Sequence, residues 1–136
     1  MIAVIGDGSL SGGEALEGLD FAAELQSNFI IIVNDNDMSI AENHGGLYQN
    51  LALLRKTDGQ TECNLFKAMG LDYVYVDRGN DVAALIKAFK EVKDSTKPVV
   101  VHINTLKGKG YAPAEKCKEQ WHYSGPFDIE TGKPLF

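Results

Sequence analysis

The stretch FIIIVNDND, Phe29–Asp37, sets five consecutive apolar residues directly before four polar ones. A strand with one face in water alternates apolar and polar side chains, whereas a strand covered on both faces is apolar at every position. Phe29–Val33 is therefore predicted to be a buried strand of a parallel sheet. Asn34–Asp37 then marks the carboxyl end of that strand.

The segments around this strand alternate in the same way. Apolar strands are also expected at residues 1–5, 71–76 and 99–103, and helices of 3.6-residue period at 12–28, 61–69 and 81–93. This alternation is typical of α/β proteins, so we predict a doubly wound, mostly parallel sheet with helices on both faces. An α/β domain is expected over residues 1–105. Residues 106–136, rich in glycine and proline, are expected to form an extended C-terminal tail of that domain.

Composition narrows the class of protein. The chain has 136 residues, of which 44% are hydrophobic, which suffices for one globular domain. Its net charge of −6 argues against a nucleic-acid or membrane-surface binder, because both need a basic face. Cys63 and Cys117 match no metal-binding spacing, and residues 1–5 are too short for a signal peptide or a membrane span. We therefore expect a cytoplasmic protein.

The segment Gly6-Asp7-Gly8 ends the first predicted strand, as Asn34–Asp37 ends the second. A right-handed crossover between parallel strands brings both ends to one edge of the sheet, where open α/β sheets bind ligands. Oxygen ligands from Asp7 and Asn36 suit magnesium or calcium rather than zinc. The amides of Gly8 and Ser9, with the helix that follows, suit a diphosphate.

Each of these residues also has a simpler interpretation. Asp7 alone is typical of a helix cap or a tight turn, and only the second motif favours a metal site. The spacing is neither G-x-G-x-x-G nor that of a nucleoside-triphosphate loop. His102 is expected to be a packed core histidine, and His44 either faces solvent or contacts substrate. Lys107 and Lys109 lie either in a solvated turn or in a loop whose backbone approaches a cofactor.

Together, GDG at residues 6–8 and NDN at 34–36 resemble the diphosphate-binding motif of thiamine-diphosphate enzymes. The segments NDNDMSIAENHGGL, residues 34–47, and KGKGYAPAE, residues 107–115, are more similar to 1-deoxy-D-xylulose-5-phosphate synthases than to transketolases. The resemblance covers nearly the whole chain. It implies an enzyme of isoprenoid precursor biosynthesis that decarboxylates pyruvate and joins the two-carbon unit to glyceraldehyde 3-phosphate.

The resemblance also implies roles for individual residues. Magnesium is expected to be held by Asp7, Asn36 and the backbone carbonyl of Met38. Thiamine diphosphate is expected to contact Gly8, Ser9, Asn36 and Tyr111. His122, in the segment WHYSGPFD, is expected at the substrate site as the candidate catalytic residue.

Synthases of this family are longer, with an upstream stretch of the same domain and a second domain that supplies a glutamate to the cofactor. We therefore expect a fragment that is inactive alone. We also expect a homo-oligomer, because the apolar strands 1–5 and 29–33 need covering. Two alternatives remain open: a transketolase or a split transketolase subunit, and a non-catalytic, magnesium-dependent binding module.

Overall fold

The computed structural model describes residues 1–136, which form two compact units, Met1–Thr105 and Leu106–Phe136. The first unit contains one parallel sheet in the order β1-β2-β4-β3. Its strands are β1 (Ile2–Gly6), β2 (Ile30–Asp35), β3 (Asp72–Val76) and β4 (Val99–Asn104). The predicted class, a parallel α/β sheet, is confirmed. Whether Leu106–Phe136 is a tail of the same domain stays a prediction.

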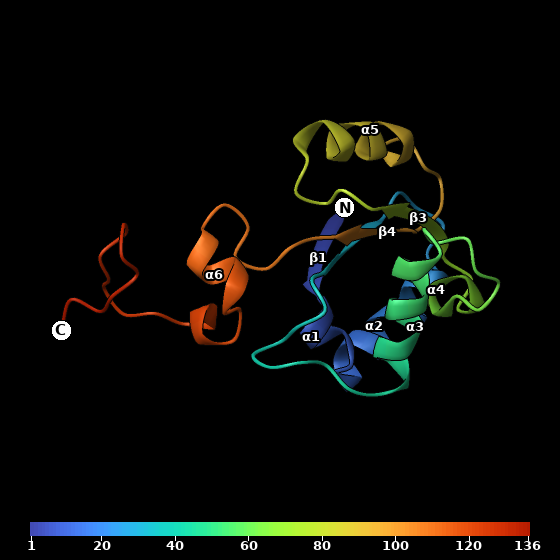
Figure 1. Cartoon of the computed structure of the whole chain (residues 1–136). Coiled ribbons are helices and arrows are strands. Elements are labelled where there is room, and N and C mark those ends of the chain that lie inside the picture. The colour runs from blue at the N-terminus through green and yellow to red at the C-terminus, as the bar shows by residue number, and fades with distance from the viewer. The chain divides into compact units, whose positions relative to one another are not determined.

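Helices cover the two faces of this sheet unequally. The helices of the first unit are α1 (Asp7–Leu10), α2 (Gly13–Ala23), α3 (Gly46–Lys56), α4 (Leu65–Ala68) and α5 (Val82–Val92). In Figure 1, α5 lies on one side of the sheet, and α2, α3 and α4 lie on the other. The face under α5 is therefore covered by a single helix.

The sheet separates two apolar clusters. The first joins α1–α4 to the sheet through Leu10, Leu19, Leu51, Leu54, Phe66, Ile31, Val33 and Val100. The second joins α5 to the sheet through Ala88, Val92, Ile30, Val99, Val101 and Ile103. Because β2 and β4 contribute to both clusters, the two central strands are apolar at nearly every position, as Phe29–Val33 predicts.

The structure differs from the sequence-based elements in three places. The helix predicted over 12–28 ends at Ala23, because none of residues 24–28 is buried. The helix predicted over 61–69 is the single turn α4, which begins where the Asn64 side chain accepts hydrogen bonds from the N–H groups of Phe66 and Lys67. Helix α3 is not among the predicted elements, although it buries Leu51 and Leu54.

The second unit contains the helix α6 (Ala112–Lys116) and the 3₁₀ turn η1 (Gln120–His122). An isolated antiparallel bridge joins Phe127 to Pro134. The aromatic rings of Tyr111, Trp121 and Phe127 pack together, with centroids 4.7 to 5.7 Å apart. In neither unit is there a helix long and apolar enough to cross a membrane.

Candidate functional site

The candidate site lies at the carboxyl edge of β1 and β2. Gly6 of β1 pairs with Asn34 of β2, so Asp7 and Asn36 follow neighbouring strands at the same edge. Asp7 is the first residue of α1 and is only 2% exposed. Its carboxylate accepts hydrogen bonds from the backbone N–H groups of Gly8 and Asn36. The structure thus brings the Asp7 carboxylate to the backbone of Asn36, at the edge where the sequence places both residues.

Two more observations describe the oxygen atoms at this edge. The side-chain Nδ2 of Asn43 donates a hydrogen bond of 2.8 Å to Oδ2 of Asp7. By contrast, Oδ1 of Asn36 is buried and has no hydrogen-bond partner. Leaving a buried carbonyl oxygen unpaired costs about 1–3 kcal/mol. A buried, unpaired amide oxygen, on a residue whose backbone N–H donates to a buried carboxylate, fits a bound cation with a preference for oxygen ligands.

The electrostatics of the edge also favour a cation. Burial, and then the negative charge of Asp35, raise the pKa of Asp7, although the backbone N–H groups oppose this shift. An ionised Asp7 is therefore held at a free-energy cost that a nearby positive charge would reduce. No group of three or more His, Cys, Asp or Glu side chains is placed to hold a metal ion, so any cation here would rely on one carboxylate with neutral oxygens.

The loop after β2 folds against the first turn of α1. Met38 and Glu42 form an isolated antiparallel bridge, and Ser39 donates its N–H to the carbonyl of Ala41 at 3.0 Å. A Cβ added at Gly8 would lie 2.5 Å from the Cβ of Ser39. Only glycine therefore allows the loop to approach this closely. The segment with the expected carbonyl ligand, Met38, is folded back over α1.

The remaining predicted diphosphate contact, Ser9, is exposed on α1. Its carbonyl accepts the N–H of Gly12 at 3.1 Å. No side chain caps the N-terminus of α2, whose N-cap residue is Gly12, so its first-turn N–H groups have no side-chain acceptor. Backbone donors are thus present on the segment where the sequence predicts diphosphate contacts. The ligand roles of Asp7 and Ser9 stay predictions.

Sequence reasoning missed a buried network next to Asn36. Asp35 is fully buried and accepts hydrogen bonds from Nη1 of Arg55, at 2.8 and 2.6 Å, and from Nε2 of His102, at 2.8 Å. Nδ1 of His102 lies 2.7 Å from the hydroxyl of Tyr73. The prediction that His102 is a hydrogen-bonded core residue is confirmed. The sequence patterns did not predict a role for Arg55, because it lies in α3, a helix that they did not predict.

The ionisation of this network follows from its contacts. Burial alone would raise the pKa of Asp35, but hydrogen bonds from His102 and Arg55, with the charge of Arg55, bring that pKa below its usual range. Because a carboxylate only accepts hydrogen bonds, Nε2 of His102 carries the shared proton. Burial, then the nearby charges, raise the pKa of the Tyr73 hydroxyl, which keeps its proton at neutral pH.

The other two predicted residues lie in the second unit. Tyr111 precedes α6 at its N-cap position, and its hydroxyl is buried without a hydrogen-bond partner. His122 ends η1, where its Nδ1 accepts from the Nζ of Lys107 at 3.0 Å. Their contacts with cofactor and substrate stay predictions. His44 is exposed in the loop before α3, which leaves both of its interpretations open.

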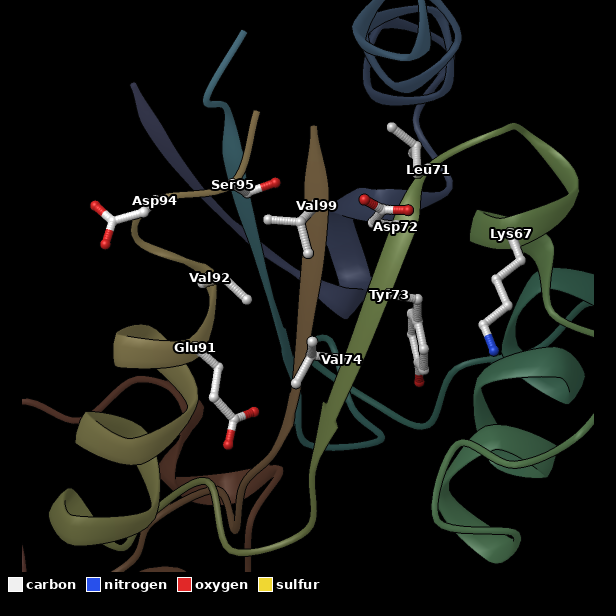
Figure 2. A pocket seen from close by; sticks show the side chains of 10 residues that line it. All are labelled: Lys67, Leu71, Asp72, Tyr73, Val74, Glu91, Val92, Asp94, Ser95 and Val99. Atoms are coloured by element: carbon white, nitrogen blue, oxygen red, sulfur yellow. The ribbon is translucent and has the colours of Figure 1, made fainter. Parts of the chain in front are cut away.

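Two cavities lie away from Asp7 and Asn36. One, of about 560 Å³, is centred on β3, with Tyr73 and Lys67 on one side and Val74 and Glu91 on the other (Figure 2). Its strand residues are the first ones of β3 and β4, so it opens at the amino end of the sheet. The other, of about 740 Å³, is lined by residues of α2, α3 and α4 with the loop before α4. No predicted site residue lines either cavity.

Solved structures with this fold define the broader class of protein. A transketolase mutant from Pichia stipitis matches with a TM-score of 0.57 and 26% sequence identity, over 81% of this chain and 15% of that one. A second transketolase mutant from the same organism, with bound xylulose 5-phosphate, matches with a TM-score of 0.56 and 27% identity. The chain therefore has a transketolase-like fold.

Sequence comparison identifies the particular family. The family model described as 1-deoxy-D-xylulose-5-phosphate synthase matches residues 1–64 and 56–105. Synthases from Porphyromonas gingivalis and Listeria monocytogenes are 36% and 40% identical to this chain, over 98% and 97% of its length. The chain belongs to the 1-deoxy-D-xylulose-5-phosphate synthase family. It spans about a quarter of these relatives, 27% and 23% of their lengths.

The family model matches this chain in two segments. The segments overlap at residues 56–64, from the last residue of α3 through the loop before α4. The alignment with the Porphyromonas synthase runs over 170 residues, more than this chain contains, whereas that with the Listeria synthase runs over 139. Neither Asp7 nor Asn36 lies in the overlap of the two matched segments.

Proposed function

We propose that this chain is the diphosphate-binding part of a 1-deoxy-D-xylulose-5-phosphate synthase and that it holds thiamine diphosphate through Mg²⁺. The observation that carries the proposal is the pair formed by Asp7 and Asn36. The buried carboxylate of Asp7 accepts the backbone N–H of Asn36, whose side-chain oxygen is buried without a partner, at the carboxyl edge of a parallel sheet. Mg²⁺ binds through few protein oxygens and completes its coordination with substrate phosphates.

In this proposal each residue at the edge has one task. Asp7, Asn36 and the backbone carbonyl of Met38 are the protein ligands of Mg²⁺. The N–H groups of Gly8 and Ser9 donate hydrogen bonds to the diphosphate. The N-terminal end of α2, which lacks a side-chain cap, adds backbone donors and a positive partial charge.

The cofactor, when bound, supplies the carbanion chemistry that joins pyruvate to glyceraldehyde 3-phosphate with loss of carbon dioxide. The contribution of this chain is to orient the diphosphate and to balance its charge. Tyr111 is proposed to pack against the cofactor and His122 to contact substrate.

The assembled enzyme is proposed to be a homo-oligomer, and the chain alone is proposed not to turn over. Support for association comes from the face of the sheet under α5. Ile2 and Val4 of β1 are 65% and 69% exposed on that face, and on α5 Val82 is 68% and Ile86 49% exposed. Exposed aliphatic side chains of this number on neighbouring elements are typical of interaction surfaces.

A transketolase is the second candidate function, because the matching solved structures are transketolases. The family match favours the synthase. Pyruvate decarboxylation measured against ketose transfer, in a full-length protein containing this segment, distinguishes the two. Ketose transfer without pyruvate consumption would contradict the synthase proposal.

A titration of the 136-residue chain tests the magnesium site. Calorimetry with thiamine diphosphate, with and without Mg²⁺, should show binding that requires the metal. Asp7→Asn keeps the shape of the side chain but removes its charge, so we expect affinity to fall about tenfold or more, equivalent to about 1.4 kcal/mol. Asp20→Asn, at an exposed position of α2, is the matched control and should bind as wild type. Equal affinity in wild type and Asp7→Asn would show that Asp7 is not a ligand.

A further inference from the structure

Arg55, in the last turn of α3, joins the two residues on either side of Asn36. Its Nη1 lies 2.8 and 2.6 Å from the carboxylate oxygens of Asp35, and its Nη2 lies 2.6 Å from Oδ1 of Asp37. One guanidinium group therefore spans the turn at Asn36. The fork geometry of arginine allows two carboxylates to be held at fixed positions, which a lysine does not do.

The Asp35 end of this bridge is rigid. Besides Arg55, its carboxylate is bonded to Nε2 of His102 and accepts the N–H of Asp37 at 3.0 Å. The backbone carbonyl of Asp35 accepts the N–H of Thr105 at 2.8 Å. Asp35 is thus hydrogen-bonded to α3 through Arg55, to β4 through His102, and to the backbone N–H of Asp37.

The Asp37 end needs such support. Asp37 has a φ of +64°, in the left-handed region that residues other than glycine rarely adopt. Its side chain is 65% exposed, so burial does not hold it in place. The contacts that fix this conformation are the Asp35 carboxylate on its N–H and Arg55 on its side chain. Released from them, Asp37 would relax towards the common backbone regions, and Asn36 would move with it.

A purely structural role would need only half of this arrangement. Neutralising the buried charge of Asp35 requires Nη1 alone, whereas Nη2 reaches out to an exposed residue. We propose that Arg55 is a positioning residue of the candidate metal site: by bridging Asp35 and Asp37 it fixes the turn that aims Asn36 Oδ1 and the Met38 carbonyl at the site. The inference deepens the proposed function and rests on it for the identity of the ligand.

The first test needs no ligand. Backbone amide hydrogen exchange of the 136-residue chain, read by NMR, reports the order of residues 36–38. We expect exchange there to accelerate about tenfold or more in Arg55→Met and in Asp37→Asn, because the first variant removes the bridge and the second removes the charge at its Asp37 end. Lys56→Met, which removes the neighbouring charge on α3, is the control. If Arg55→Met unfolds the chain, Asp37→Asn decides, since Asp37 is exposed. Unchanged exchange in Asp37→Asn would overturn the proposal.

The second test separates positioning from general stability. Mn²⁺ affinity is measured by electron paramagnetic resonance for wild type, Asp37→Asn, Asn36→Ala and the double variant. If the bridge acts through Asn36, Asp37→Asn weakens Mn²⁺ binding about tenfold in the wild-type background and less than twofold in Asn36→Ala. An equal loss in both backgrounds would overturn the positioning role. Absence of Mn²⁺ binding by wild type would contradict the proposed function, while the exchange measurement would still decide the role of Arg55.

Discussion

The β1–β2 half of the sheet and the β3–β4 half treat their helix ends differently. Helices α2 and α3, in the segments after β1 and β2, have Gly12 and Gly45 as N-cap residues and no side-chain cap. Helix α5, which follows β3, has Asp81 as its N-cap residue, and Oδ1 of Asp81 accepts hydrogen bonds from the N–H groups of Ala83 and Ala84 at 2.8 and 3.1 Å. Backbone donors are therefore satisfied by side chains in one half and left without side-chain acceptors in the other.

The two halves of the sheet also differ in how much of their apolar surface is exposed. Val4 and Val101 lie in one row across the sheet, because Ile32 pairs with both. Val4 is 69% exposed, whereas Val101 is fully buried under α5. The unpaired oxygen of Asn36 follows β2, although β3 also has one buried oxygen without a partner, the hydroxyl of Tyr75. The two halves therefore differ in their helix caps and in the exposure of their apolar rows: the β1–β2 half leaves apolar surface available for binding, whereas the β3–β4 half buries it.

The largest effect is expected where the halves meet, at Asp35. Asp35→Asn removes the buried carboxylate that pairs with Arg55 and leaves only the exposed Asp37 as its charged partner, which costs about 3–5 kcal/mol. Since the pKa of Asp35 is lowered in the fold, its contribution is present at neutral pH and is lost as pH falls below about 4. Urea unfolding should therefore show a difference between wild type and variant that narrows from pH 6 to pH 3. Asp72→Asn, exposed on β3, is the control, and a difference independent of pH would contradict this account.

The two valines give a direct comparison of the halves. Val101→Ala removes two buried methyl groups and leaves a cavity, so we expect a loss of about 2–3 kcal/mol. Val4→Ala makes the same chemical change at an exposed position and should alter stability by less than about 0.5 kcal/mol. Chemical denaturation of the two variants measures both. Similar losses would mean that β1 is covered in solution, for instance by a second copy.

Gly8 tests the close approach within the β1–β2 half. Gly8→Ala drives a methyl group into Ser39, with an expected cost of about 1–3 kcal/mol and displacement of the loop that carries Met38. Gly13→Ala is the matched control, because a Cβ there meets no atom within 4 Å. Thermal unfolding experiments should show a lower Tm for Gly8→Ala and an unchanged Tm for Gly13→Ala. Equal Tm values would show that the loop can move away at no cost.

The smallest effect is expected for Asn64, whose side chain caps the N-terminus of α4. Asn64→Ala removes the acceptor of the N–H groups of Phe66 and Lys67, which should cost about 1 kcal/mol. Gln60→Ala, in the same loop, should change the free energy of unfolding by no more than about 0.5 kcal/mol. Urea midpoints of the two variants check the prediction. An unchanged midpoint in Asn64→Ala would indicate that α4 needs no cap.

Local patterns predicted all four strands, because each is an apolar run bounded by polar or glycine residues. The meeting of Asp7 with Asn36 was predictable too, since it depends only on two consecutive parallel strands. Arg55 was not, because its contact with Asp35 depends on how α3 packs. The contact of Gly8 with Ser39 likewise depends on a loop whose path no periodicity describes. The strand order was out of reach for the same reason, since β2 pairs with β4 rather than with β3.

That strand order has a kinetic consequence. β4, the last strand in the sequence, lies between β2 and β3, and its pairing joins residues 30–35 to 99–104. Forming contacts between residues so distant in the sequence costs the entropy of closing a large loop before any stabilising interaction is gained. Such contacts therefore slow folding. During synthesis, the backbone edges of β2 and β3 that pair with β4 stay unpaired until residue 104 has emerged. Asp35 meets His102 only then, so the candidate metal site is among the last parts of this sheet to form.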